Sequence, residues 1–267
     1  MCLLVLAWRA HPRYRLVVAA NRDEYHGRPA AAMSPWNDLP ILAGRDLEAG
    51  GTWLGVDRAR RFGVVTNFRE MVRRPAGAPS RGGLVPAWLK DTRGVADHAA
   101  SLRATAADYA GFNLLFADRD SLYYLSNRLE SFSRPLASGV HGLANHYLDT
   151  PWPKLLRVRH GLERWLGERN ADPRSLFALL ADRAPASDGD LPDTGLSPEW
   201  ERALSAPFVV HGEYGTRCST VLALGHDDSL QIEEQSWDAT GRLTDVASYR
   251  LGPEDWPAGN PPAPAQL

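Results

Sequence analysis

The chain opens with apolar residues in two short runs, at residues 2–8 and 15–20, on either side of a polar stretch that contains a proline. Runs of this length around such a stretch are typical of a β-hairpin, and the first run is predicted to be a buried strand. Pairing Trp8 near Leu16 would bring the polar residues that follow the second run back beside Cys2. The hairpin therefore places the second residue of the chain next to a polar segment.

Further along, strand-like and helix-like patterns alternate. Strands are predicted for residues 53–56, 62–68, 112–117, 121–125, 208–210, 216–224 and 230–235. Helical patterns cover residues 84–107, with a break near Gly94, and two later segments that begin with an N-cap and a proline, at Thr150 and Pro151 and at Asp172 and Pro173.

The order of these elements is strands first, helices in the middle and strands again. This order favours a layered α+β domain in which helices cover a largely antiparallel pair of sheets. We assign residues 1–251 to one such domain and the proline-rich residues 252–267 to a C-terminal tail. Residues 184–198 combine proline, glycine and aspartate without periodicity and are predicted to form a surface loop.

Composition and charge exclude several classes of protein. The 267 residues suffice for a sizeable core, and 44% of them are hydrophobic. The 30 basic and 32 acidic residues are scattered and give a net charge of -2, so no basic stripe suits nucleic acid. The apolar start is too short for an integral membrane segment and lacks the basic residues of a signal peptide. Two cysteines without paired spacing suggest a reducing, cytoplasmic location.

Cys2 is a candidate nucleophile because removal of Met1 would make it the N-terminal residue. A small second residue permits that trimming, and the freed α-amine would have a pKa of roughly 7.7 to 8.0. A thiol with a pKa of about 8.5 can pass its proton to such an amine without a histidine. Taken alone, a cysteine here is more often a small buried hydrophobe at the head of a strand. The motifs elsewhere in the chain favour the nucleophile.

Four other residues have the chemistry to support Cys2. In the hairpin register, Asp23 would reach the Cys2 amine, and its carboxylate would hold the ammonium that forms in the reaction. Asn67 and Asn145 each follow a strand-like run, and their amides are the neutral donors that an oxyanion hole requires, although each alone is more often a turn residue. Arg217 lies in a strand otherwise suited to burial, where its charge requires a partner, either Asp23 or a substrate carboxylate.

Other residues of the same segments are predicted to contact the substrate or to be structural. Asn21, Arg22 and Trp53 are predicted to contact the substrate. Strand alternation places Cys218 on the face opposite Arg217, so Cys218 is expected to be buried, inert and free of a disulfide. The histidines are scattered without carboxylates at metal-ligand spacing, so no bound metal is expected.

Together these motifs resemble the NRDE family, also called the transport and Golgi organisation protein two family, whose name is the tetrapeptide at residues 21–24. The resemblance spans nearly the whole chain. It also includes residues 1–2, 51–55, 66–70, 145, 149 and 214–220.

The NRDE family is similar to the penicillin V acylase and bile salt hydrolase group. That likeness implies a four-layer αββα fold with an N-terminal cysteine nucleophile. The aspartate, two asparagines and arginine that support the nucleophile in that group carry over onto Asp23, Asn67, Asn145 and Arg217. One departure is that an arginine of that group falls on Ala20 here, while Arg22 occupies a position that the group leaves apolar.

The sequence therefore predicts a cysteine N-terminal-nucleophile hydrolase that cleaves a small acyl amide or thioester after removal of Met1 and uses no cofactor. The alternative is a non-catalytic protein that binds haem or acyl-lipid and acyl-CoA in the same pocket, since NRDE family members are linked to the handling of these molecules. A weaker alternative, in which a distant histidine serves Cys2 as in papain, has no histidine motif in its favour. The expected partner is a small acyl substrate or ligand, and the oligomeric state stays open.

Overall fold

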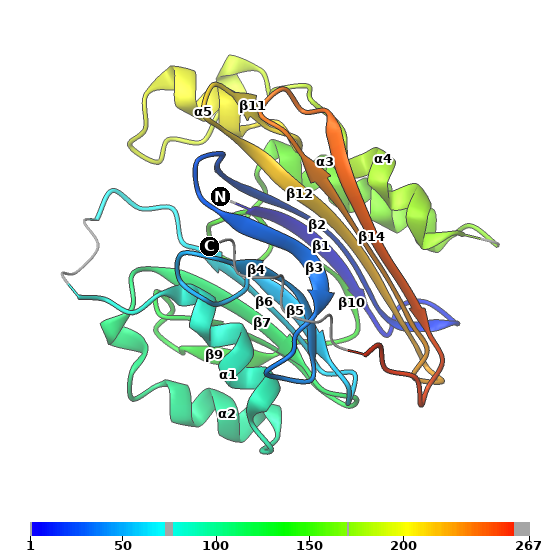
Figure 1. The fold of residues 1–267 in the computed structure, drawn as a ribbon. Helices are drawn as coiled ribbons and strands as arrows, with labels where there is room; N and C mark the ends of the chain where they lie inside the picture. Colours follow the sequence, from blue (N-terminus) through cyan, green and yellow to red (C-terminus); the bar gives the residue numbers. More distant parts are fainter. Residues whose placement is uncertain (1, 73–76, 170, 259–267) are drawn as a thin grey trace, which may run out of the picture.

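A computed structural model of the chain describes residues 2–72, 77–169 and 171–258. The backbone forms two antiparallel β-sheets that pack face to face, with helices on their outer sides (Figure 1). This mixed architecture agrees with the predicted α+β class. Within the described ranges, no helix is long and apolar enough to cross a membrane.

The first sheet holds the amino-terminal strands near its centre. Its strands follow the order β10-β1-β2-β12-β13-β14, and β11 pairs with β12. The bounds are β1 Cys2–Trp8, β2 Tyr14–Tyr25, β10 Gly139–Leu143, β11 Val210–His211, β12 Tyr214–Gly225, β13 Leu230–Trp237 and β14 Leu243–Leu251. All of β1 is buried, because alternate side chains face the second sheet and the helices behind the first.

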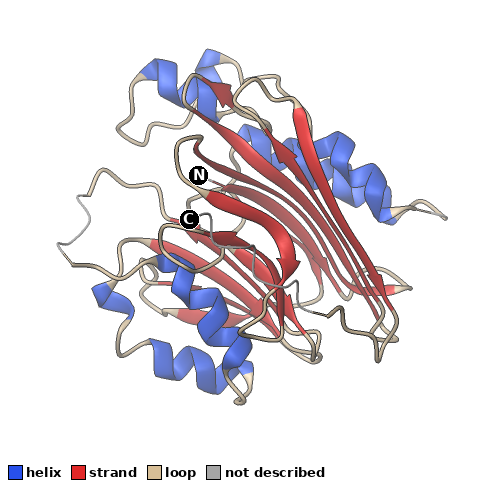
Figure 2. Ribbon diagram, in the orientation of Figure 1, coloured by secondary structure: helices blue, strands red, loops and turns tan. Residues whose placement is uncertain are grey.

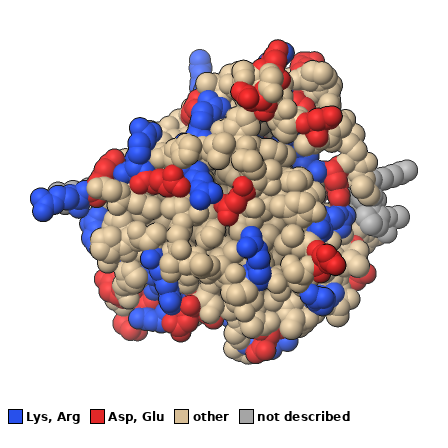
Figure 3. Space-filling view, turned by 180° about the vertical axis from the view of Figure 1, so that it is seen from behind, with Lys and Arg blue, Asp and Glu red and all other residues tan. Residues whose placement is uncertain are grey.

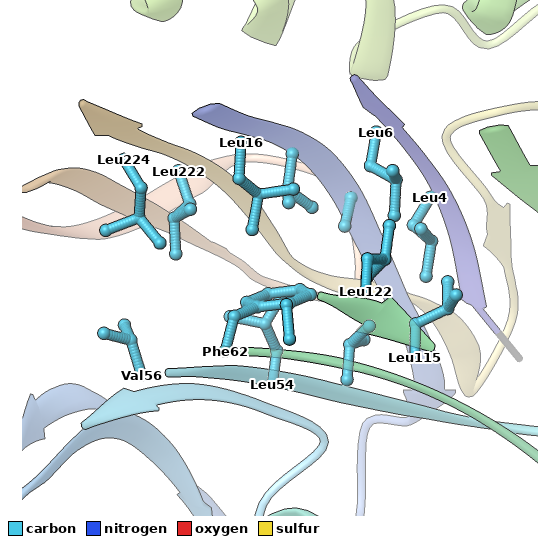
Figure 4. Close-up of a cluster of buried hydrophobic side chains, with 14 of the residues drawn as sticks. Leu4, Leu6, Leu16, Leu54, Val56, Phe62, Leu115, Leu122, Leu222 and Leu224 are labelled. Carbon is cyan, nitrogen blue, oxygen red and sulfur yellow. The ribbon is translucent and has the colours of Figure 1, made fainter. Parts of the chain in front are cut away.

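The second sheet is a meander whose strands follow chain order from β3 to β9. The bounds are β3 Ala30–Pro35, β4 Ile41–Asp46, β5 Leu54–Asp57, β6 Phe62–Asn67, β7 Phe112–Ala117, β8 Leu122–Ser126 and β9 Ser133–Pro135. Its inner face meets the first sheet in an apolar core. In Figure 4, leucines of β1, β2 and β12 lie against Leu54, Val56 and Phe62 of the second sheet.

Two groups of helices pack on the outer faces of the sheets (Figure 2). The second sheet is covered by α1 Leu84–Lys90 and α2 Val95–Leu102, and the first by α3 Pro153–Leu166, η3 Pro173–Leu176 and α4 Phe177–Leu180. The remaining helices are η1 Arg81–Gly83, η2 Ala106–Asp108, η4 Asp188–Asp190 and α5 Pro198–Leu204. Trp88 is buried in the hydrophobic cluster between α1, α2 and the second sheet, and Trp165 in the cluster between α3 and the first sheet.

The predicted hairpins are confirmed. β1 and β2 are antiparallel with Trp8 opposite Leu16, and the same register sets Cys2 opposite Arg22. β5 and β6 form the second hairpin, which ends at Asn67. The helical pattern of residues 84–107 is interrupted as expected, since α1 ends before Gly94 and α2 begins after it.

The predicted start of α3 is wrong by two residues. α3 begins at Pro153 with Trp152 as its N-cap, whereas Thr150 donates its hydroxyl to the Tyr147 carbonyl in the preceding turn. Two X-Pro pairs follow one another here, Thr150-Pro151 and Trp152-Pro153, and Pro153 of the second pair begins the helix.

The predicted tail begins in contact with the domain. Arg60 donates to the carbonyls of Gly252, Pro253 and Asp255, and its guanidinium lies 5.7 Å from the ring centre of Trp256. Trp256 packs against the core between the sheets. Residues 259–267, the rest of the predicted tail, lie outside the described residues.

The surface agrees with a chain of balanced charge. Acidic and basic side chains are intermixed over the face seen in Figure 3, with no continuous field of one sign. The predicted loop at residues 184–198 is at the surface and includes no buried residue.

Candidate active site

A cavity of about 420 Å³ lies between the two sheets at one end of the stack. Its walls come from the start of β1, the end of β2 and the start of β12 in the first sheet, and from the ends of β4 and β6 in the second. Cys2, Asp23, Asn67 and Arg217 all line it. The cavity thus joins four of the five predicted catalytic residues.

Cys2 is the first residue of β1 and is 7% exposed, so only a small part of its side chain reaches the cavity. Burial raises the pKa of the Cys2 thiol above its ordinary value, while the positive charge of Arg22 opposes that shift. A thiol held in its neutral form needs a base close by before it can attack a carbonyl.

Asn145 connects Cys2 to Asn67. Its Oδ1 accepts from the Cys2 backbone nitrogen at 3.0 Å, and its Nδ2 donates to the Asn67 carbonyl at 3.1 Å and to the Asn67 Oδ1 at 2.9 Å. Asn145 is fully buried and has a φ of 65°, a left-handed conformation that asparagine adopts more readily than most residues. The amide of Asn145 therefore holds the other two residues and does not face the cavity.

Asp23 lies beside Cys2 near the end of β2. Its Oδ1 accepts from the Thr216 hydroxyl at 2.8 Å, and its carbonyl accepts from the Tyr214 hydroxyl at 3.0 Å. Burial raises the pKa of the Asp23 carboxyl, and the positive charge of Lys154 acts in the opposite direction. Thr216 of β12 thus holds the carboxylate and Tyr214 of β12 holds the backbone beside it, while Lys154 of α3 favours the charged form.

Arg217 lines the cavity but does not pair with Asp23, although both lie in the described chain. Its Nη1 donates to the carbonyls of Tyr25 and Arg28, at 2.8 and 2.9 Å. Of the two partners expected for its charge, only a substrate group remains compatible with this geometry.

The prediction that Cys218 faces away from Arg217 is wrong. β12 contains a register shift between Thr216 and Cys218, so the simple alternation of side chains is broken there, and both Arg217 and Cys218 line the cavity. Cys218 is buried and, like Cys2, is a free thiol, as expected. The two cysteines face the same residue of β2 from opposite sides, a separation of two strand spacings, about 9.5 Å, which is too wide for a disulfide.

Two of the three predicted substrate contacts line the cavity. Arg22 and Trp53 do so, and the nearest acidic group to Arg22 is Glu24 at 3.8 Å. Asn21 does not. Its Nδ2 donates to the carbonyls of Leu180 and Pro207, both at 2.9 Å, on the helical side of the sheet. The prediction for Asn21 is wrong because its side chain is buried on the helical side of the sheet, whereas Arg22, opposite Cys2, is on the cavity side.

Lys154, in the first turn of α3, lies near the site but was not among the predicted site residues. Its side chain is 1% exposed, and its Nζ has no hydrogen-bond partner among the described residues. Burial lowers the pKa of Lys154 to about 8, against the attraction of Asp23. A signal for it was present, since Lys154 lies four residues before Val158 on the buried face of α3, where a charged residue is unexpected.

A buried ion pair between Arg69 and Glu201 lies near Lys154. The Nη1 of Arg69 donates to the Glu201 carboxylate at 2.9 Å, and both side chains are about 5% exposed. The guanidinium of Arg69 also lies 4.5 Å from the ring centre of Trp152, the N-cap of α3. Over the described ranges, no group of three or more histidine, cysteine or acidic side chains is arranged to hold a metal ion.

Comparison with known proteins gives full-length relatives. The chain is 32% identical over 282 residues to the Transport and Golgi organization protein 2 homolog of Bos taurus, which covers 94% of this chain and 99% of that protein. The human protein of the same name is 30% identical, with 88% of this chain and 93% of the relative covered. The Drosophila melanogaster Transport and Golgi organization protein 2 is 25% identical, with 88% and 92% covered.

Among solved structures, the C2A mutant of the conjugated bile acid hydrolase from Clostridium perfringens matches 95% of this chain and 98% of its own, with a TM-score of 0.46 and 6% identity. A family model described as Transport and Golgi organisation 2 matches residues 1–239. The resemblance to the NRDE family is therefore confirmed, and the chain belongs to the Transport and Golgi organisation 2 family.

Proposed function

We propose that the protein is a cysteine N-terminal-nucleophile hydrolase that cleaves an acyl amide or thioester once Met1 has been removed. The observation that carries this proposal is the 3.0 Å contact between the Cys2 nitrogen and Asn145 Oδ1, beside Asp23 and at the edge of a cavity. Removal of Met1 would turn that nitrogen into a free amine already held by a hydrogen-bond acceptor. Met1 itself lies outside the described residues.

In this reaction the Cys2 Sγ attacks the substrate carbonyl carbon, and the thiol proton passes to the neutral α-amine. The Asp23 carboxylate stabilises the resulting ammonium. The ammonium then gives its proton to the leaving nitrogen or sulfur as the C–N or C–S bond breaks, which leaves a thioester on Cys2. Water, deprotonated by the same amine, releases the acyl group as a carboxylate and regenerates the thiol.

The two asparagines have different roles in this proposal. Asn67 lines the cavity, and its Nδ2 makes no hydrogen bond to another described residue, so it can donate to an oxyanion while its Oδ1 accepts from Asn145. Asn145 is turned away from the cavity and holds both Asn67 and the Cys2 nitrogen in place. Asn145 is therefore a positioning residue, a narrower role than the oxyanion donor expected from the sequence.

The cavity walls favour an acyl substrate that carries an anionic group. The Nη1 of Arg217 is occupied by backbone carbonyls, which fixes the guanidinium and leaves its Nη2 for a ligand. Arg22 faces the same space, next to Cys2. Trp53 offers an apolar wall for the acyl part of the substrate.

The proposal extends to the fold and the setting of the reaction. We infer that the two sheets and their outer helices form the four-layer αββα sandwich of N-terminal-nucleophile hydrolases, within a single domain of residues 1–251. Helices on both outer faces of the sheet pair support this inference. Two free thiols suit the reducing cytoplasm. No cofactor takes part in the reaction as proposed.

The test begins with the intact mass of protein purified from a bacterial cytosol, which should be one methionine short. Trimmed protein is then screened against acyl amides and thioesters with and without an anionic group. Cys2→Ala should abolish turnover at a cost of about 1 to 2 kcal/mol in stability, and Cys2→Ser should retain little, since a hydroxyl is harder to deprotonate. A chain with an N-terminal extension, which blocks the amine and keeps the thiol, should also be inactive.

The alternative of a binding protein makes the opposite prediction. Haem or an acyl-CoA would bind equally to wild-type and Cys2→Ala protein, and trimmed wild type would turn over no acyl substrate. That pair of results would refute the hydrolase proposal and leave the cavity as a ligand pocket.

A further inference from the structure

We propose that Lys154 is a positioning residue that acts with Asp23 to keep the Cys2 amine and thiol ready for proton transfer near neutral pH. This inference rests on the proposed function, because it assigns a role within the same site. It is drawn from the burial of one cation, the groups that surround it, and the choice of lysine at that position.

The choice of lysine is unusual for this chain. Only two of its 30 basic residues are lysines, Lys90 and Lys154, and all the others are arginines. Lys90 is exposed at the end of α1, whereas Lys154 is buried in the first turn of α3. A buried lysine can lose its proton near neutral pH, but an arginine keeps its charge. The site therefore holds a cation that can titrate, in a chain that uses arginine almost everywhere else.

The charged and titratable groups that act on Lys154 come from several elements. Asp23 of β2 and Glu201 of α5 attract its charge, Arg69 after β6 repels it, and the Cys2 thiol of β1 interacts with it when ionised. Tyr214 of β12 interacts with the same cluster, through Asp23, Cys2 and Arg69. The Lys154 Nζ has no hydrogen-bond partner among the described residues, so burial and these charges, and not a fixed bond, set its protonation.

The protonated lysine acts on Cys2 through charge. A positive charge near the α-amine disfavours a second ammonium, so it keeps more of the amine as free base. The same charge favours the thiolate. Both effects bring the pH at which Cys2 becomes nucleophilic to a lower value. Because the pKa of Lys154 is about 8, its charge, and with it this advantage, is lost as the pH rises through that value.

The experiment measures the alkylation rate of Cys2 by iodoacetamide from pH 5 to 10, in full-length trimmed protein, with peptide mass spectrometry to separate Cys2 from Cys218. We expect Lys154→Met to lower the alkylation rate of Cys2 about tenfold below pH 8, which corresponds to about one unit in the pKa of the thiol. Above about pH 8 the two profiles should converge. Lys90→Met, the only other lysine of the chain, should match wild type throughout.

Lys154→Met leaves a thioether where an ammonium was buried, so its fold is checked by circular dichroism and urea unfolding. A second measurement needs no variant at position 154. Protein labelled with ¹³C-lysine has two lysine signals, and the Lys154 signal should titrate near pH 8 with Lys90 as internal reference. In Asp23→Asn protein its midpoint should fall, because the attraction of the carboxylate is lost.

The results separate the two proposals. If Cys2 is alkylated at the same rate in trimmed protein and in the N-terminally extended chain, the amine is not its base, and both proposals fail. If trimming accelerates alkylation but Lys154→Met leaves the profile unchanged, only the role of Lys154 is refuted. A Lys154 signal that does not move between pH 6 and 9 would refute that role as well.

Discussion

Asn145→Ala should be among the most destabilising substitutions at this site. The change removes three hydrogen bonds that join Asn145 to the Cys2 nitrogen and to Asn67, each worth about 1 kcal/mol in a buried setting. It also places a residue with a Cβ but no local hydrogen bond at a φ of 65°, which adds about 1 kcal/mol. We therefore expect a loss of about 4 kcal/mol in the free energy of unfolding.

A glycine at the same position separates the two causes. Asn145→Gly loses the same hydrogen bonds but tolerates the left-handed backbone, so it should cost about 3 kcal/mol, less than the alanine variant. Asn37, an exposed asparagine, provides the control, and Asn37→Ala should change stability by less than about 0.5 kcal/mol. The midpoint and slope of urea unfolding at pH 7 measure all three.

The result that would refute this reasoning is equally specific. A loss below about 1 kcal/mol for both Asn145 variants would mean that Cys2 and Asn67 do not depend on this side chain. Equal losses for alanine and glycine would mean that the hydrogen bonds matter but the backbone conformation does not.

Two further predictions concern the walls of the cavity. Gly51→Ala should lower the free energy of unfolding in urea by about 1 to 3 kcal/mol, because a Cβ there would lie 2.1 Å from the Gly82 carbonyl oxygen. Gly83 has open space around it, so Gly83→Ala should leave stability nearly unchanged. Equal effects of the two substitutions would contradict the close approach of Gly51 to Gly82. Burial raises the pKa of Glu234, so its ionisation costs stability as the pH rises from its unfolded value of 4.5 through the folded value. Glu234→Gln should therefore be more stable than wild type at pH 8 but not at pH 4. The gain should be about 1.4 kcal/mol for each unit by which folding raises the pKa of Glu234.

The first hairpin shows what the sequence could predict. Two apolar runs of matching length around a short polar turn admit few registers, and the register with Trp8 near Leu16 is the observed one. The same register, carried to the start of β1, places Arg22 and not Asn21 opposite Cys2. The error over Asn21 arose because the strand, predicted for residues 15–20, continues to Tyr25 and turns the Asn21 side chain to the helical side.

Other features left weaker signals. β14 was not predicted, because as an edge strand it has no fully buried residue, and polar residues are interspersed among its apolar ones. The bulge at Arg217 follows from pairing with β2 and has no local sequence mark, so alternation failed there for Cys218. The burial of Lys154 also depends on residues far away in the sequence, because it results from the packing of α3 against β1.

The position of Cys2 explains why the site is assembled from such distant parts of the chain. The proposed nucleophile supplies its own base and so has to stand at an amino terminus, and Cys2 begins a strand in the interior of a sheet. The flanking strands therefore determine what surrounds it. β10 pairs with β1, and the residues that follow β10 bring Asn145 to the Cys2 nitrogen. On the other side, β2 places Arg22 opposite Cys2, and Asp23 is the next residue along β2.

The same geometry limits where the other groups can be. Residues further inside the strands lie in apolar cores on both faces, where an unpaired polar group would be costly, and residues well beyond the strand ends lack a rigid support. The last residue of β6, Asn67, and the first turn of α3, with Lys154, meet both requirements. Convergence at one end of the two sheets thus follows from placing Cys2 at the head of an interior strand.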